Sequence, residues 1–180
     1  VKVDTQTVAK AAELTSNDYV TFKDTELEVT AGMPLTGGTN GSVDGTAHQN
    51  YLNKIESYTY NTMGVVVTDD TTKKLYAAFN RRMRDELGIK SQLVVYNYAA
   101  DYMGVINVKN KVTDTGWSEA SLVYWVTGAE SGCEVNKSCQ NKKYDGGFTV
   151  NTDYTQNDLK QAIKAGEFTL HKVNGIVRVL

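Results

Sequence analysis

The sequence predicts an α/β fold: a layered core in which a mainly parallel sheet is flanked by helices, with a C-terminal antiparallel hairpin and a small N-terminal β-rich appendage. Two observations lead to this prediction. Between residues 46 and 131, short apolar runs typical of buried strands alternate with amphipathic helical stretches, which is the order of parallel β-α units. Near the end of the chain, Asn174-Gly175 separates two strand-like runs and is the strongest short signal for a hairpin.

The N-terminal part has a different character from the rest. Residues 5–14 have the Ala-rich composition of a short helix, and residues 19–30 have the pattern of two short strands. Residues 31–46 hold five glycines and the only proline, which makes them the clearest break in composition. We therefore place a boundary between two parts of the chain in this stretch.

The core is predicted to start with a helix over residues 46–58 and a Val-rich strand at Met63–Val67 that is buried on both sides. A second helix is expected over residues 70–87, because an apolar residue recurs there at every fourth position. Asp69 suits its N-terminus and Gly88 its C-terminus. The predicted apolar stripe consists of Leu75, Phe79, Met83 and Leu87.

Two more strands of the buried type are predicted at Leu93–Tyr96 and Val105–Val108. A helix should then run from Ser118, a good N-cap residue, to about Ser131, with Trp117 packed on Leu122 as a hydrophobic staple. The polar residues 132–147 are expected to form a loop.

The predicted elements end with a helix and a hairpin. Thr155 is expected to cap a helix that ends near Ala165, with Asp158 at the third helical position and an apolar face of Leu159, Ala162 and Ile163. The two strands of the hairpin are predicted at Glu167–Val173 and Ile176–Leu180.

Composition excludes several function classes. The chain has 180 residues, of which 41% are hydrophobic and 22% charged, so a packed core is expected. The net charge of −2 argues against a nucleic-acid partner, which would require a basic excess. The longest apolar runs are too short to cross a bilayer and no signal peptide is visible, so we expect no membrane binding.

The sequence offers few groups for catalysis. The two histidines are His48, at the start of a predicted helix, and His171, in a predicted hairpin strand, and a surface or half-buried position explains both better than catalysis. Cys133 and Cys139 are separated by five residues, which is neither a redox motif nor a zinc pattern, and both a disulfide and two free thiols stay open. We expect no catalytic, cofactor-binding or metal-ligating residue, and no cofactor.

Two loop motifs imitate ligand sites without completing them. The glycine-rich stretch at residues 36–41 lacks the Lys that a phosphate-binding P-loop requires. Residues 40–45 resemble the first half of a calcium loop, but Tyr51 stands at the twelfth position, where a bidentate Glu is needed. A connecting loop is the better interpretation of both.

Tyrosines and tryptophans are scattered near the predicted ends of elements. Such residues are enriched at protein–protein interfaces, although the edge of a core explains each one equally well. The residues concerned are Tyr58, Tyr60, Tyr96, Tyr98, Tyr102, Tyr124 and Trp125.

Several strings in the sequence resemble contractile-tail sheath proteins. Leu35–Gly41 (LTGGTNG), followed by the Tyr51-Leu52-x-x-Ile55-Glu56 pattern, is similar to the start of the core domain in that family. The resemblance runs from about residue 5 to residue 180, and it points to sheath proteins of defective prophages and phage-tail-like bacteriocins from Gram-positive bacteria. Further similar strings are Tyr60–Met63, Phe79–Gly88, Val105–Val108, Gly128–Ser138, Tyr144–Gly146 and Phe168–Val179.

The resemblance implies a structural protein and not an enzyme. The core of such sheaths is similar to the subtilisin fold without its catalytic triad. The implied role is a subunit of a contractile sheath that assembles as a helical tube around the inner tail tube protein and drives it through a cell envelope. The implied partners are further copies of the chain and the inner tube protein. The implied location is the bacterial cytoplasm during assembly and then the tail of a phage or phage-tail-like particle.

Three expectations complete the interpretation. Because the chain begins at Val1 and ends in an apolar β-pattern, we expect an internal fragment. The resemblance implies that residues 1–31 are the end of a peripheral β-rich domain, that residues 32–180 form an incomplete α/β core without the C-terminal domain, and that the isolated chain is monomeric. The charged face of the helix at residues 70–87 is a candidate lattice contact, with a solvated face as the simpler explanation. The alternatives in function are a fragment of an α/β hydrolase-like enzyme with its catalytic residues elsewhere, or a sugar- or surface-binding module.

Overall fold

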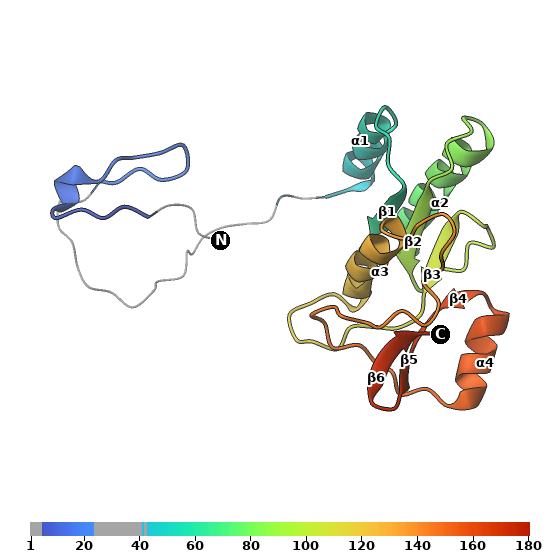
Figure 1. The fold of residues 1–180 in the computed structure, drawn as a ribbon. Coiled ribbons are helices and arrows are strands. Elements are labelled where there is room, and N and C mark those ends of the chain that lie inside the picture. Colours follow the sequence, from blue (N-terminus) through green and yellow to red (C-terminus); the bar gives the residue numbers. More distant parts are fainter. Residues whose placement is uncertain (1–4, 24–40, 42) are drawn as a thin grey trace. The chain divides into compact units, whose positions relative to one another are not determined.

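The computed structural model describes residues 5–23, 41 and 43–180 (Figure 1). The chain separates into two compact units, Val1–Ser42 and Val43–Leu180, and each is described by itself. The division falls within the glycine-rich stretch at residues 31–46.

In the N-terminal unit, the helix predicted over residues 5–14 is wrong. Only a single 3₁₀ turn, η1 (Ala11–Glu13), forms there. The side chain of Gln6 donates to the carbonyl of Thr15 at 2.7 Å and accepts from its amide at 2.8 Å. A continuous helix would hold these two residues too far apart for both bonds. No strand forms among residues 19–23, because Asn17 Oδ1 accepts from two successive amides and makes a turn. The remainder of the second predicted segment, residues 24–30, lies outside the described residues.

The C-terminal unit contains the predicted parallel sheet. Its four strands lie in the order β1-β2-β3-β4, and all neighbours are parallel. The strands are β1 (Thr62–Val65), β2 (Gln92–Tyr96), β3 (Val105–Val108) and the short β4 (Glu167–Phe168). The connection from β2 to β3 contains no helix, in agreement with the two successive strands predicted at Leu93–Tyr96 and Val105–Val108.

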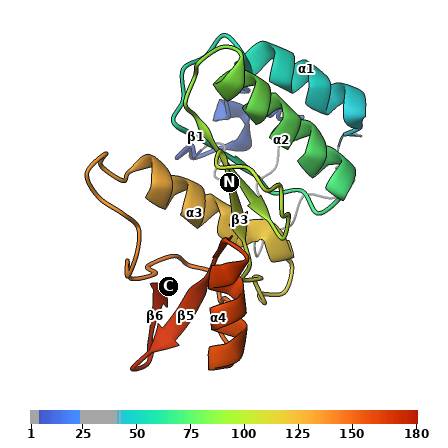
Figure 2. The same cartoon turned by 90° about the vertical axis from the view of Figure 1, so that its right-hand side faces the viewer.

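Helices cover both faces of the sheet, as predicted (Figure 2). The helices α1 (Gly45–Ile55) and α2 (Asp70–Asp85) lie on one side, and α3 (Leu122–Ser131) lies on the other. The register of β2 explains this arrangement: Leu93 and Val95 face α2, whereas Val94 between them faces α3. The strand is therefore buried on both sides.

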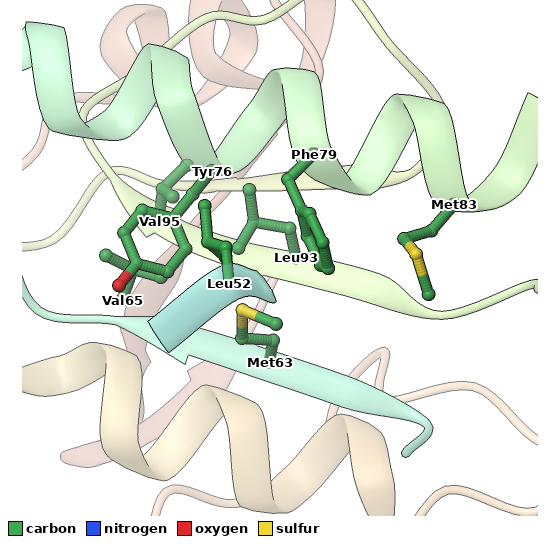
Figure 3. Packing of buried hydrophobic residues seen from close by; sticks show 8 residues of the cluster. All are labelled: Leu52, Met63, Val65, Tyr76, Phe79, Met83, Leu93 and Val95. Carbon is green, nitrogen blue, oxygen red and sulfur yellow. The ribbon is translucent and has the colours of Figure 1, made fainter. Parts of the chain in front are cut away.

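The first hydrophobic cluster fills the space between the sheet and α1 and α2 (Figure 3). Full burial of a side chain of this size stabilises the fold by about 1.5–3 kcal/mol, so this cluster is a main source of stability. Its buried members are Leu52, Met63, Val65, Tyr76, Phe79, Met83, Leu93 and Val95.

Helix α2 begins as predicted, but it ends at Asp85, before the predicted end at residue 87, and its buried stripe is different. Asp69 accepts from the Thr72 amide at 2.7 Å, and Gly88 has a φ of +72° after the helix end. Leu87 is 49% exposed because the helix stops at Asp85 and the chain turns away, and Tyr76 is buried in the cluster.

The second hydrophobic cluster lies on the opposite face, between the sheet, α3 and the C-terminal hairpin. A 3₁₀ turn, η2 (Glu119–Ser121), precedes α3, and Ser118 caps it by accepting from the Ala120 amide. Trp117 packs edge-on against Phe148, with 5.1 Å between ring centroids. The buried members of this cluster are Val94, Val108, Val112, Leu122, Val123, Val126, Leu170 and Val179.

Helix α4 (Gln156–Lys164) is capped as predicted. Thr155 and Asp158 form a capping box, and Gly166 has a φ of +68° beyond the end. Leu159 and Ala162 are buried. The prediction for Ile163 is wrong, since its side chain is 62% exposed and faces a surface groove.

The hairpin forms around Asn174-Gly175, both at positive φ, and consists of β5 (Leu170–Val173) and β6 (Ile176–Val179). The first predicted strand was too long, because Glu167–Phe168 pairs with β3 in the parallel sheet. At the start of β5, just after β4, the side chain of Asn110 accepts a hydrogen bond from the Leu170 amide and donates one to the Leu170 carbonyl. These two backbone groups of Leu170 are therefore bound by a side chain and not by the backbone of a neighbouring strand.

None of the described helices has the length and hydrophobicity needed to cross a membrane.

Candidate assembly surface

The two histidines lie apart and have different surroundings. His48 in α1 hydrogen-bonds the Tyr76 hydroxyl through Nδ1 at 3.0 Å, and the two rings meet edge-on. His171 lies in β5 and lines a groove beside α4. Within the described part of the chain, no hydrogen bond joins either ring to a serine or cysteine, and so no nucleophile–base pair is assembled.

Both cysteines are free thiols and line the same surface pocket, of about 470 Å³, after α3. Cys139 is buried, and its thiol donates to the Ala129 carbonyl at 3.5 Å. Burial, followed by the nearby Glu130 carboxylate and Cys133, raises the pKa of the Cys139 thiol to about 12. This thiol is therefore protonated and unreactive at neutral pH.

The glycine-rich stretch at residues 36–41 lies outside the described residues except for Gly41. The structure excludes a calcium loop in the part that it describes, because Asp44 caps α1 by accepting from the Ala47 amide, and residues 45–51 are helical. Among residues 5–23, 41 and 43–180, no group of three potential His, Cys, Asp or Glu ligands comes together.

The charged face of α2 is engaged within the chain. Arg82 forms a two-bond ion pair with Glu56, which lowers the pKa of that carboxyl and raises the pKa of the guanidinium. The guanidinium of Arg81 lies 4.6 Å from the centre of the Tyr102 ring. Arg84 donates to the Ser91 carbonyl at 2.6 Å. Because these side chains contact their own chain, fewer charged groups of this face are free to bind a neighbouring protein.

The aromatic residues that the sequence suggested for an interface divide into three groups. Trp125 is held by its own chain, since it packs edge-on against Tyr144 and donates to Asp145 at 2.7 Å. Tyr58 and Tyr124 are each 60% exposed. The structure leaves Tyr60, Tyr96, Tyr98 and Tyr102 partly buried at the rims of the core.

Tyr58 belongs to an aromatic patch at the end of α1 and in the turn after it, which we define by Tyr51, Ile55, Tyr58 and Tyr60. Together with Lys54, these side chains line a shallow pocket of about 390 Å³ with an almost entirely apolar surface. This patch was not predicted from the sequence. Tyr51, Ile55 and Tyr58 recur there at helical spacing, but the same spacing also fits a buried helix face.

A second surface feature is a groove between α4 and the hairpin, here called the α4 groove. Its lining combines aliphatic residues (Leu159, Ile163, Val173 and Leu180) with polar and basic ones (Gln156, Lys160, Lys164, His171, Lys172 and Asn174). The volume is about 540 Å³. This groove was not predicted from the sequence, because Ile163 was expected to face the core together with Leu159 and Ala162.

The described surface therefore carries features of the kind found at contacts with other macromolecules. Exposed apolar and aromatic side chains gather on α1 and beside α4, and such patches mark interaction sites in soluble proteins.

Comparison with known proteins shows what this chain is similar to. The family model of the phage tail sheath protein central domain matches residues 41–180. The chain is 33% identical over 190 residues to the phage-like element PBSX protein XkdK of Bacillus subtilis (strain 168), and 31% identical over 190 residues to the uncharacterized protein YqbK of the same strain. The chain spans 41% of the length of each of these relatives.

Two solved structures share the fold. The sheath tail protein from Desulfitobacterium hafniense matches with a TM-score of 0.77 and 39% identity, covering 98% of this chain and 44% of that one. The sheath tail protein from Listeria innocua matches with a TM-score of 0.72 and 34% identity, covering 98% of this chain and 42% of that one.

Proposed function

This chain belongs to the phage tail sheath protein family, and on that basis we propose that it forms the central part of a subunit of a contractile tail sheath. Membership of the family supports a structural role in the tail. The observation that carries the proposal is the family match over residues 41–180, to which the similarity to two sheath tail proteins adds the same fold.

In the proposed assembly, copies of the full-length subunit form a helical tube around the inner tail tube protein. Contraction of the tube drives the inner tube through a cell envelope. Subunits assemble in the bacterial cytoplasm and then belong to the tail of a phage or phage-tail-like particle. The likeness to a phage-like element protein of Bacillus subtilis supports a prophage or bacteriocin type of particle.

We further propose that residues 1–31 end a peripheral domain and that residues 32–180 form the sheath core without its C-terminal domain. The isolated chain would then be monomeric at ordinary concentrations. The relatives' greater length supports this proposal, since 59% of each lies beyond the part that the chain covers (100% less the 41% covered).

The surface supports a non-enzymatic role. The histidines lie in separate surroundings, the Cys139 thiol has a raised pKa, and the apolar patches on α1 and beside α4 suit protein contacts.

The test is negative-stain electron microscopy of the full-length protein that contains this chain, expressed alone. Long hollow tubes with a helical surface are expected, while the 180-residue chain serves as a control that forms none. Dispersed full-length protein with saturable hydrolytic activity would overturn the sheath proposal in favour of the hydrolase-like alternative.

A further inference from the structure

The two cysteines stand at the two ends of one short loop that follows α3. Cys133 comes directly after the helix end, and its amide donates to the Glu130 carbonyl at 3.1 Å. Five residues separate it from Cys139. The Cys139 side chain is buried, whereas Cys133 is partly exposed, and both residues line the same pocket.

A tight turn between the two cysteines reverses the chain. The Lys137 amide donates to the Glu134 carbonyl at 2.9 Å, which is the hydrogen bond of a β-turn, and the side chains of these two residues form an ion pair at 2.7 Å. In such a turn the first and the fourth Cα atoms lie within about 7 Å of each other. Cys133, immediately before the turn, and Cys139, two residues after it, are thereby brought back toward each other.

The two thiols are direct neighbours. The Cys139 thiol donates to the Ala129 carbonyl at 3.5 Å, which fixes its position. After burial and the Glu130 carboxylate, a side-chain hydrogen bond with Cys133 is the next cause of the raised pKa of Cys139. These contacts all lie within residues 129–139, so the proximity of the two sulfur atoms does not depend on what packs over the pocket.

The two thiols differ in their readiness to react. The nucleophile in disulfide exchange is a thiolate and not a thiol. Burial and the raised pKa keep Cys139 protonated, so it does not start a reaction with a dissolved oxidant. It is instead placed to attack a sulfur of Cys133 that has already been activated, because proximity gives this second step a high effective concentration.

We propose that Cys133 and Cys139 are a modification site at which a reversible intramolecular disulfide forms, with Cys133 reacting first and Cys139 closing the bond. The oxidant is a low-molecular-weight disulfide such as oxidised glutathione. The Cys133 thiolate attacks one sulfur of the oxidant and releases one thiol, and the Cys139 sulfur then attacks the Cys133 sulfur of the mixed disulfide and releases the second. Both protein thiols are oxidised, the oxidant is reduced to two thiols, and these take up the two protons.

The bond would join the end of α3 to a segment that lies along β6. The Asn141 amide donates to the Val179 carbonyl at 3.0 Å, and the Val179 amide donates to the Lys142 carbonyl at 2.9 Å. Closing the loop of residues 133–139 restricts the unfolded chain and so stabilises the fold. In a sheath that assembles in a reducing cytoplasm, the bond would form only after the particle leaves the cell; this timing rests on the proposed function, whereas the modification site does not.

The first experiment treats the reduced 180-residue chain with oxidised glutathione, blocks the remaining thiols and maps the products by mass spectrometry. Trypsin cleaves after Lys111, Lys137 and Lys142, so the two cysteines fall in separate peptides, residues 112–137 and 138–142. The expected main product is a monomer in which a reducible bond joins these two peptides. A lasting glutathione adduct or a disulfide-linked dimer as the main product would overturn the inference.

Single substitutions separate the roles of the two cysteines. Cys139→Ser should leave a lasting glutathione adduct on Cys133, because no second thiol displaces it. Cys133→Ser should leave Cys139 unmodified for at least about ten times longer than Cys133 in the other variant, because burial protects the thiol. Equal rates of modification in the two variants would contradict the assigned order.

A matched control keeps two cysteines but moves one of them. In Cys133→Ser/Val135→Cys, the first thiol stands within the turn at a fully exposed position and stays in the same tryptic peptide. The joined peptides should form at least about tenfold more slowly than in the original chain, since the thiols are no longer neighbours. Similar rates in both would show that the observed arrangement of the loop is not what brings the thiols together.

The stabilising effect of the bond has its own measurement. Oxidation should raise the melting temperature of the chain by about 5 °C, and dithiothreitol should reverse the rise. The variant Cys133→Ser/Cys139→Ser should show no shift under the same treatment. A melting temperature that oxidation lowers would overturn the stabilising role of the bond.

The same oxidation of the full-length protein distinguishes failure of this inference from failure of the proposed function. If full-length protein forms tubes but yields no joined peptides, the sheath role stands and this inference is wrong. If joined peptides form in full-length protein that makes no tubes, the modification site stands and the sheath proposal fails.

Discussion

Asn110 links the sheet to the hairpin through its side chain. It is fully buried, and its amide group donates to the carbonyls of Asn151 and Leu170 and accepts from the Leu170 amide at 2.6 Å. Three segments distant in sequence are thus joined by one side chain.

Asn110→Ala should lower the free energy of unfolding by about 2–4 kcal/mol, because it leaves buried backbone groups of Leu170 and Asn151 without partners. Urea denaturation measures this change. Asn53→Ala, at an exposed position of α1, is the control and should change stability by less than about 0.5 kcal/mol. An equal, small effect of both variants would show that Asn110 does not hold the junction.

Several carboxylates have lowered pKa values in the fold. The Thr72 amide and hydroxyl lower the pKa of Asp69, the Trp125 indole lowers that of Asp145, and Thr155 lowers that of Asp158. The Arg82 guanidinium does the same for Glu56.

These shifts predict acid sensitivity. A carboxylate whose folded pKa lies below its unfolded value contributes stability that is complete above the unfolded pKa of about 4 and is lost as pH falls through the folded value. The urea midpoint should therefore be nearly constant from pH 7 to pH 5.5 and fall below pH 4. A midpoint that does not fall down to pH 2.5 would contradict this account.

At the scale of elements, α4 owes its start to the capping box of Thr155 and Asp158. The helix has nine residues, and isolated helices of this length are not stable in water. Its cap and its buried Leu159 and Ala162 must therefore hold it in place.

Thr155→Ala should lower the free energy of unfolding by about 1 kcal/mol, since it leaves the Asp158 amide without its hydroxyl acceptor. Thermal denaturation followed by circular dichroism measures the shift. Gln156→Ala, one residue later and without a cap contact, is the control and should have little effect. If both variants shift the melting temperature equally, the cap is not the cause.

The contact between β1 and α3 depends on Gly64. A Cβ atom at this position would overlap Thr127 Oγ1 and approach Val123 Cγ1 to 3.0 Å. The absence of a side chain therefore lets the helix pack directly on the strand.

Gly64→Ala should destabilise the fold by about 1–3 kcal/mol through overpacking. Adding Thr127→Ala should recover part of the loss, because the nearest obstructing atom is removed. Gly128→Ala, in the middle of α3 with nothing within 4 Å, is the control and should be neutral or stabilising. Chemical denaturation of the three variants measures their free energies of unfolding. A Gly64→Ala variant as stable as the original chain would show that the strand and the helix are not closely packed at this position.

At the scale of the whole molecule, both hydrophobic clusters belong to residues 43–180. None of the buried members of either cluster comes from the N-terminal unit. The two units are therefore expected to fold independently.

A protein of residues 43–180 alone should unfold cooperatively, at a melting temperature within a few degrees of that of the whole chain. Near-UV circular dichroism should show the same fixed environment for Tyr76 and Trp125, because their contacts lie within this unit. Loss of cooperative unfolding in the shorter protein would show that the N-terminal unit stabilises the core.

The sequence by itself determined the elements of the core and their class. Helix periodicity, the caps at Asp69, Ser118 and Thr155, and the Asn174-Gly175 turn are local signals, and the structure confirms each. The family was also visible in the sequence, because several of its strings resemble sheath proteins, and the family model matches residues 41–180.

Only the tertiary structure decided which apolar residues stay at the surface. Ile163 and Leu87 fit an apolar stripe in the sequence, yet their side chains stay 62% and 49% exposed. The break between β4 and β5 depends on Asn110, which lies 60 residues before Leu170, and the α4 groove depends on where the hairpin turns back toward the helix. Burial of a side chain requires a neighbour from a distant segment, and the spacing of residues along one helix or strand contains no information on that neighbour.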